Sequence, residues 1–324
     1  MMIEVTDIQM DGVVVGIDVA KPELVFYADR EKDLFTARNE SAALRRIAKR
    51  LLKLKPRVVV FEASGGYEAL AVRIFSELGL PVAVVYPKRI RQFVRGLGVL
   101  AKTDGIDARM IAYYARVANI KPIPPATPEL QHLQALRTRR DQLIEMRIAE
   151  QNRLETAHTC MRRDIQKHID SLNREVEKIE KKLASLIAES DALRKMSDSL
   201  RSVPGVGPVL STTLIAELPE LGLLSNRKIA SLVGLAPFPD DSGSRTGKRS
   251  IKGGRNSVRR VLYMATISAS RSNPVIQDYY QSLCSRGKLK KVALIAAARK
   301  LLITLNAIIK NNSSWHYEPV SSSA

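Results

Sequence analysis

The chain has 324 residues, of which 45% are hydrophobic and 26% charged, so it can form two or three globular domains and is not intrinsically disordered. Its net charge of +19 and pI near 10.0 favour a polyanionic partner, and residues 201–324 carry 18 Lys and Arg against 6 Asp and Glu. Two distant cysteines exclude a disulfide framework, and no apolar run reaches the ~18 residues of a membrane span, so we expect a cytoplasmic protein without a membrane partner.

The first part of the chain alternates apolar runs with helical patterns, which predicts an α/β domain over residues 1–122. We expect strands and helices at these positions: strands over 12–19, 24–28, 58–62 and 82–86, and helices over 41–53 and 67–78. The basic residues between positions 88 and 95 are expected in a loop, where they either hold a phosphate backbone or are simply solvated.

Four carboxylates stand where strand ends and a helix face would aim them at one pocket. Asp18 closes the apolar run 12–17 and Glu62 closes the run 58–61, so both would lie at carboxyl ends of buried strands, where ligands collect. Asp104 and Asp107 are three residues apart, on one face of a helix. Hard oxygen ligands favour Mg²⁺ or Mn²⁺, and a pair of such ions can clamp the attacking and leaving oxygens of a phosphodiester. Taken singly, each acid could instead cap a turn or a helix, or pair with an arginine.

A proline-rich segment over residues 121–128 predicts a domain boundary, and residues 123–200 have a helical pattern. The stretch 129–158 is predicted to be helical and residues 162–164 to turn the chain. The second helix carries a heptad-like apolar series, typical of a coiled coil: Leu172, Val176, Ile179, Leu183, Leu186, Leu193 and Leu200. We expect an antiparallel helical hairpin that self-associates, with an internal core contact as the alternative.

Residues 201–324 are predicted to form a mainly α-helical domain. Residues 202–208, followed by a helical pattern over 209–217, resemble a helix-hairpin-helix element, in which Gly205 and Gly207 would let backbone N–H groups approach a nucleic-acid phosphate. A helix is expected to end at Gly234, and a further one carries Arg259 and Arg260.

Between that glycine and that helix lies a polar loop with a serine beside many cations. Seven Lys and Arg fall between positions 245 and 260, where they could neutralise phosphates or the charge that builds at a transferring phosphorus. A serine there could be a nucleophile, although Ser-Gly-Ser is also common in flexible loops. The candidate nucleic-acid contacts are Lys102, Gly205, Gly207, Arg245, Lys248, Arg249, Lys252, Arg255, Arg259 and Arg260.

These motifs, in this order, resemble the Piv-type DEDD/serine insertion-sequence transposase family, whose members include bridge-RNA-guided DNA recombinases. The agreement extends from about residue 12 to 310. The N-terminal matches are 16–21, 62–67 and 102–110, and the C-terminal matches are 204–207, 238–243, 259–264 and 299–301. The chain departs from the family pattern at Asp240 and Asp241, where basic residues are frequent, and at Ser64, where Thr is frequent.

The resemblance implies a ribonuclease H-like (RuvC-like) N-terminal domain with Asp18, Glu62, Asp104 and Asp107 as metal ligands. It implies that Ser242, rather than Ser244, attacks DNA and forms a transient phosphoserine link. It further implies a homo-oligomer, a dimer or a tetramer, in which the acidic and serine domains of different subunits complete one site. Donor and target DNA would be the substrates, with a structured guide RNA as partner.

Three other functions compete with this one. A metal-dependent Holliday-junction-type endonuclease would use the serine loop only to bind DNA. An actin-like sugar or acetate kinase would explain the motif at residues 16–18, but the chain lacks a second glycine-rich phosphate loop at the expected place. A nucleic-acid-binding protein without catalysis would need the basic surface alone.

Overall fold

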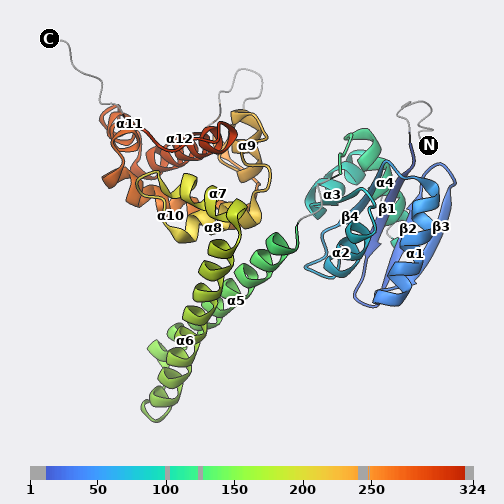
Figure 1. Cartoon of the computed structure of the whole chain (residues 1–324), viewed down its shortest axis with the longest axis horizontal. Coiled ribbons are helices and arrows are strands. Elements are labelled where there is room, and N and C mark those ends of the chain that lie inside the picture. The colour runs from blue at the N-terminus through green and yellow to red at the C-terminus, as the bar shows by residue number, and fades with distance from the viewer. Residues whose placement is uncertain (1–11, 99–102, 123–126, 240–246, 248, 318–324) are drawn as a thin grey trace. The chain divides into compact units, whose positions relative to one another are not determined.

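The computed structural model describes residues 12–98, 103–122, 127–239, 247 and 249–317 (Figure 1). The chain divides into two compact units, residues 1–126 and 127–324. The boundary between them, after residue 126, falls within the predicted proline-rich segment 121–128. The second unit contains both the helical hairpin and the C-terminal helices, so the predicted boundary at residue 200 stays a prediction.

The N-terminal unit contains a five-stranded sheet in the order β3-β2-β1-β4-β5. Its strands are β1 Val14–Val19, β2 Glu23–Ala28, β3 Asp33–Arg38, β4 Val58–Glu62 and β5 Val82–Val85. The first three strands pair antiparallel, whereas β1, β4 and β5 run parallel. The four predicted strands are confirmed. Strand β3 was missed because it alternates half-buried and exposed residues and begins and ends with charged side chains.

Each face of the sheet is covered by its own pair of helices. The pair α1 Ser41–Leu54 and α2 Ala69–Glu77 packs against odd-numbered residues of β1 such as Ile17, and the pair α3 Pro87–Gly96 and α4 Asp104–Val117 packs against Val14. This alternation follows from the two-residue repeat of a strand. The prediction of a basic loop over 88–95 was wrong, because these residues form α3. Pro87 at its first position favours a helix start, and Ile90 anchors it in the core.

The second unit begins with a two-helix hairpin, α5 Pro128–Thr156 and α6 Thr159–Glu189, which lie side by side in Figure 1. The antiparallel hairpin is confirmed, with Arg140 bonded to Glu180 and Arg147 to Asn173 across it. The predicted turn at residues 162–164 was wrong. Those residues lie inside α6, and the chain turns at 157–158, where both residues have extended backbone angles.

The remaining helices form the C-terminal core: α7 Asp191–Arg201, α8 Pro208–Glu217, α9 Asn226–Val233, α10 Asn256–Ser272, α11 Pro274–Ser285 and α12 Lys290–Lys310. A short ribbon, β6 Pro237–Phe238 with β7 Ser250–Ile251, accompanies them. The heptad-like series divides between two cores. Leu172 and Val176 pack on Leu143 within the hairpin, whereas Leu183 and Leu200 belong to the C-terminal core.

Helix α12 is the one helix in the described part of the chain that is long and apolar enough, by length and composition, to cross a membrane. Its residues Ala297, Leu301 and Leu305 are fully buried in the C-terminal core. Core packing therefore accounts for its apolar composition.

Candidate functional site

Two of the four predicted carboxylates lie at the same level on neighbouring strands. In the parallel ladder of β1 and β4, Ile17 pairs with Phe61, so the next residues are Asp18 and Glu62. Strand alternation places both on the face that α4 covers, because Val14 and Val60 contribute to the core on that face. Both acids are half-buried at the carboxyl edge of the sheet.

Gly16, on the same face as Asp18, lets helix α4 approach the sheet closely. A Cβ atom on Gly16 would lie 2.2 Å from the carbonyl oxygen of Ala108 and 2.4 Å from the backbone nitrogen of Ala112. Only glycine fits such a contact between backbones. The next turn of α4 toward its start contains Asp107 and Asp104.

The far end of α4 is held at the start of β1. Arg116 Nε donates a 2.6 Å hydrogen bond to Asp29 Oδ2, and Arg116 Nη2 donates to the carbonyl oxygen of Gly12 at 3.0 Å. Asp29 Oδ1 in turn accepts from the backbone N–H of Val14 at 2.9 Å. Because its last turn lies at the start of β1, α4 runs antiparallel to this strand. Its first turn therefore lies toward the carboxyl edge of the sheet.

The first turn of α4 begins at Thr103, whose side chain accepts a 3.3 Å hydrogen bond from the backbone N–H of Ile106. This cap is of the kind that favours a helix start. Asp104 is exposed and Asp107 half-buried in this turn. Sheet register and helix direction thus bring the four predicted carboxylates to one edge of the N-terminal unit.

Asp18, Glu62 and Asp107 each take part in an interaction in the structure. As placed, no three carboxylate, imidazole or thiol side chains in the described ranges are grouped closely enough to hold an ion. The chemistry of the donor set fits Mg²⁺ or Mn²⁺, because four carboxylates supply only hard oxygen ligands.

The loop after Glu62 is fixed by a carboxylate that the sequence analysis did not single out. Glu68 Oε2 accepts hydrogen bonds from the backbone N–H of Ser64 at 3.1 Å, from its hydroxyl at 2.9 Å and from the N–H of Gly66 at 3.0 Å. Partial burial raises the pKa of Glu68, but hydrogen bonds from its own backbone, from Ser64 and from Gly66 outweigh this and lower it. In the sequence, the only sign of this interaction is the four-residue spacing between Ser64 and Glu68.

Two of the seven cations between residues 245 and 260 hold the protein's own backbone in place. Arg255 Nη1 and Nη2 donate to the two carboxylate oxygens of Glu220 at 2.5 and 2.6 Å, and Nη1 also donates to the carbonyl of Glu217 at 2.9 Å. Arg259 Nη1 donates to the carbonyl of Gly253, and Nη2 donates to Asn256 Oδ1 at 3.0 Å. These guanidinium groups stabilise the segment that carries the other cations.

The other predicted contacts differ in their surroundings. Arg249, Lys252 and Arg260 are exposed, and Lys252 takes part in an interaction. Among the described residues, no hydrogen bond or ion pair involves the side chain of Arg249 or of Arg260. The following predicted site residues lie outside the described residues: Lys102, Ser242, Arg245 and Lys248.

The two predicted glycines before α8 also have different surroundings. Gly205, at φ +90°, packs on α10, because a Cβ there would lie 2.5 Å from Ala269 Cα. Gly207 is exposed, caps the start of α8 without a side chain, and has open space where a Cβ would stand. A phosphate could therefore approach the backbone at Gly207. Both phosphate contacts stay predictions.

Comparison with known proteins agrees with the order of these motifs. A family model for DEDD transposases of the IS110 type matches residues 15–161, and a model for transposases of the IS116/IS110/IS902 family matches residues 197–281. The first match contains the four carboxylates. The second contains Ser242 and the seven cations.

Similar curated proteins include the pilin gene-inverting protein of Moraxella bovis, 29% identical over 259 residues, which are 78% of this chain and 80% of that protein. The transposase for insertion sequence element IS1111A of Coxiella burnetii (strain RSA 493 / Nine Mile phase I) is 24% identical over 281 residues, 77% of this chain and 75% of that protein. A 44.8 kDa protein of insertion element IS116 from Streptomyces clavuligerus is 34% identical over 118 residues, 36% of this chain and 29% of that protein. The resemblance inferred from the motifs is confirmed: the chain belongs to the IS116/IS110/IS902 family of transposases and is an enzyme that acts on DNA.

Proposed function

We propose that this enzyme is a site-specific recombinase of an insertion sequence, which cuts and rejoins DNA through Ser242 with the help of a divalent metal site. The observation that carries the proposal is the register of Asp18 and Glu62, which lie at one level on the sheet face that α4 covers. The first turn of α4 lies toward the same edge of the sheet. The strand order, with three antiparallel strands followed by two parallel ones, supports a ribonuclease H-like fold of the RuvC branch for residues 1–122.

Asp18, Glu62, Asp104 and Asp107 would hold Mg²⁺, or Mn²⁺. When bound, such an ion supplies Lewis-acid stabilisation of the charge on a phosphodiester. The chain's own contribution is positional. Glu68 fixes the loop after Glu62, and the close contact at Gly16 fixes α4 against β1. The proposed ligands at the end of β4 and on α4 are therefore held in fixed positions relative to Asp18 on β1.

In the proposed cleavage step, the hydroxyl oxygen of Ser242 forms a bond to the scissile phosphorus, and the bond from that phosphorus to a deoxyribose oxygen breaks. The proton of the serine hydroxyl is transferred to the leaving deoxyribose oxygen, which departs as a hydroxyl group. One strand end then remains attached as a phosphoserine. Attack by the hydroxyl end of another strand reverses the step, rejoins DNA and restores the serine.

We further propose that the chain acts as a dimer or tetramer on donor and target DNA in the cytoplasm, in complex with a structured guide RNA. The exposed apolar residues of the hairpin, Met146, Ile148 and Met161, support self-association through residues 123–200 as a coiled coil. Aromatic residues make up only 5% of the chain, which favours leaving sequence choice to an RNA. The relative named as a pilin gene-inverting protein supports DNA rearrangement as the class of outcome.

A denaturing gel tests the serine step. The wild-type protein, incubated with its DNA and Mg²⁺, is expected to give a covalent protein–DNA band that Ser242→Ala abolishes and Ser244→Ala retains. Free DNA ends without a covalent band would contradict the serine mechanism and favour the Holliday-junction-type endonuclease. Recombination by protein from which RNA has been removed would contradict only the proposal of a guide RNA. The proposed strand-transfer function would be unaffected.

A further inference from the structure

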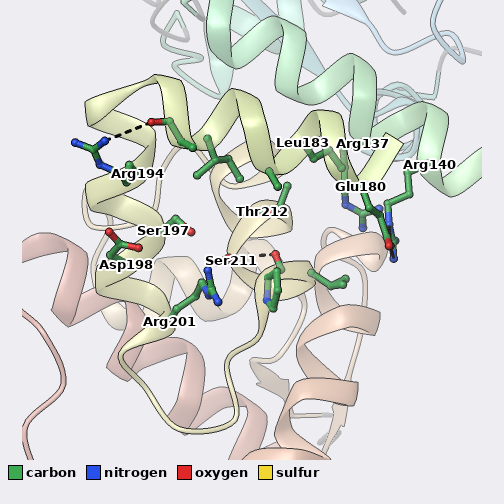
Figure 2. Close-up of a pocket in the computed structure, with 15 residues that line it drawn as sticks. Arg137, Arg140, Glu180, Leu183, Arg194, Ser197, Asp198, Arg201, Ser211 and Thr212 are labelled. Atoms are coloured by element: carbon green, nitrogen blue, oxygen red, sulfur yellow. Dashed lines mark hydrogen bonds and ion pairs between the residues drawn. The ribbon is translucent and has the colours of Figure 1, made fainter. Parts of the chain in front are cut away.

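A cavity of about 490 Å³ lies within the second unit, lined by residues of α5, α6, α7 and α8 (Figure 2). Leu183 and Ile187 of α6 and Val209 of α8 give it an apolar wall. Ser197, Ser211 and Thr212 also line it, and the Ser211 hydroxyl donates a 3.1 Å hydrogen bond to the carbonyl oxygen of Pro208. Apolar surface with a few polar residues is typical of a pocket that holds a small organic group.

Four arginines line this cavity, and three of them are paired with carboxylates of the protein. Arg140 is bonded to Glu180, Arg137 to Asp141, and Arg194 to Asp191. In the described part of the chain, no hydrogen bond or ion pair is formed by the guanidinium of Arg201, which Figure 2 shows on the side of Ser211. Of the two acids in the lining, Glu180 is taken by Arg140, and Asp198 stands one turn before Arg201 on α7.

The start of α8, whose first-turn residue Ser211 is shown near Arg201 in Figure 2, also borders the cavity. Pro208 and Val209, the first two residues of this helix, are lining residues. The residue before them, Gly207, offers no side-chain cap, so the first N–H groups of α8 lack the usual side-chain acceptor. A helix start with an adjacent unpaired guanidinium favours an anion, and a phosphate in particular.

We propose that this cavity binds one unpaired nucleotide of a bound nucleic acid, with the base against Leu183, Ile187 and Val209 and the phosphate at Arg201. An apolar wall beside a cationic end matches a nucleotide, which joins a flat base with apolar faces to a charged phosphate. Because the chain acts on DNA, its own substrate can supply such a nucleotide. The inference rests on the proposed action on DNA but requires neither Ser242 nor the metal site.

Two duplexes that differ only in a single extrahelical 2-aminopurine test the proposal with the full-length protein. We expect the bulged duplex to bind about tenfold more tightly than the paired one, because one added charge-assisted contact is of that order. An RNA pair of the same design identifies whether the unpaired nucleotide comes from DNA or RNA. Preference for either bulge supports the site.

Matched variants test whether the preference for the bulged duplex arises in the cavity. Arg201→Ala is expected to remove it, whereas Lys195→Ala, a loss of one charge from the exposed surface of the same helix outside the cavity, retains it. Ala184→Trp, a substitution at an exposed lining residue of α6, should fill the cavity and also remove the preference without weakening paired-duplex binding. Circular dichroism checks that each variant is folded.

Equal binding of bulged and paired duplexes by the wild-type protein, in both DNA and RNA, would overturn the proposal while leaving DNA binding itself intact. So would a preference that survives both Arg201→Ala and Ala184→Trp. Binding of an acidic, leucine-rich peptide that Ala184→Trp abolishes, with no bulge preference, would assign the cavity to a protein segment instead.

Discussion

The acidic edge of the N-terminal unit and the basic segment before α10 use charge in different ways. At the acidic edge, backbone register and one glycine contact bring Asp18, Glu62 and the first turn of α4 together. In the basic segment, Arg255 and Arg259 are committed to the protein's own oxygens, while Arg249 and Arg260 are exposed. The proposed metal ligands lie on regular elements of the fold, and the exposed cations lie beside others that hold their segment in place.

Removing a carboxylate from the acidic edge should have the largest effect. Asp18→Asn and Glu62→Gln are each expected to lower the recombination rate by about 10³-fold, because each removes a proposed ligand and its charge. Glu77→Gln, which changes an exposed carboxylate in surface ion pairs, should stay within about twofold. Strand-exchange rates measured under saturating Mg²⁺ check this, and full activity of Asp18→Asn would contradict the site.

The close contact between β1 and α4 can be broken without touching a carboxylate. Gly16→Ala would place a methyl group against the backbone of α4 and is expected to lower the free energy of unfolding by about 3 kcal/mol. Gly207→Ala meets open space and changes only the N-cap of α8, so it should change this free energy by less than about 1 kcal/mol. Urea denaturation followed by circular dichroism measures both. Equal stabilities would show that α4 does not need the glycine.

The positions of the four carboxylates at one edge could be predicted because strand ends and a three-residue spacing on a helix are local patterns, whereas their role as metal ligands stays a prediction. Prediction from the sequence failed where a local pattern was ambiguous. The density of Lys and Arg over residues 88–95 indicated a loop, although Pro87 and Ile90 signalled the helix that forms. The roles of Arg255 and Arg259 depend on partners such as Glu220, distant in the chain, which a count of charges does not reveal.

Because some cations pair within the protein and others are exposed, substitutions of Arg255 and Arg260 should affect different properties, folding stability and DNA binding. Arg255→Ala should lower the free energy of unfolding by about 2 kcal/mol, because it leaves the partly buried Glu220 without its partner. Arg260→Ala should leave stability unchanged and weaken DNA binding, with the slope of log affinity against log salt falling in magnitude by about 1. Denaturation and a salt titration of binding measure the two effects. A stable Arg255→Ala protein would contradict the structural role of this side chain.

The smallest effect is expected for the carboxylate that fixes the loop after Glu62. The folded pKa of Glu68 lies below its ordinary value of 4.5, so its ionised form stabilises the fold above that pH, and this contribution is lost as the pH falls through the folded pKa. Glu68→Gln should therefore cost under about 1 kcal/mol near neutral pH, and the difference from wild type should shrink under acidic conditions. Urea denaturation at a series of pH values measures it. Because the hydrogen bonds from Ser64 and Gly66 go to an ionised acceptor, a difference that stayed constant down to strong acid would mean that shape rather than charge holds this loop.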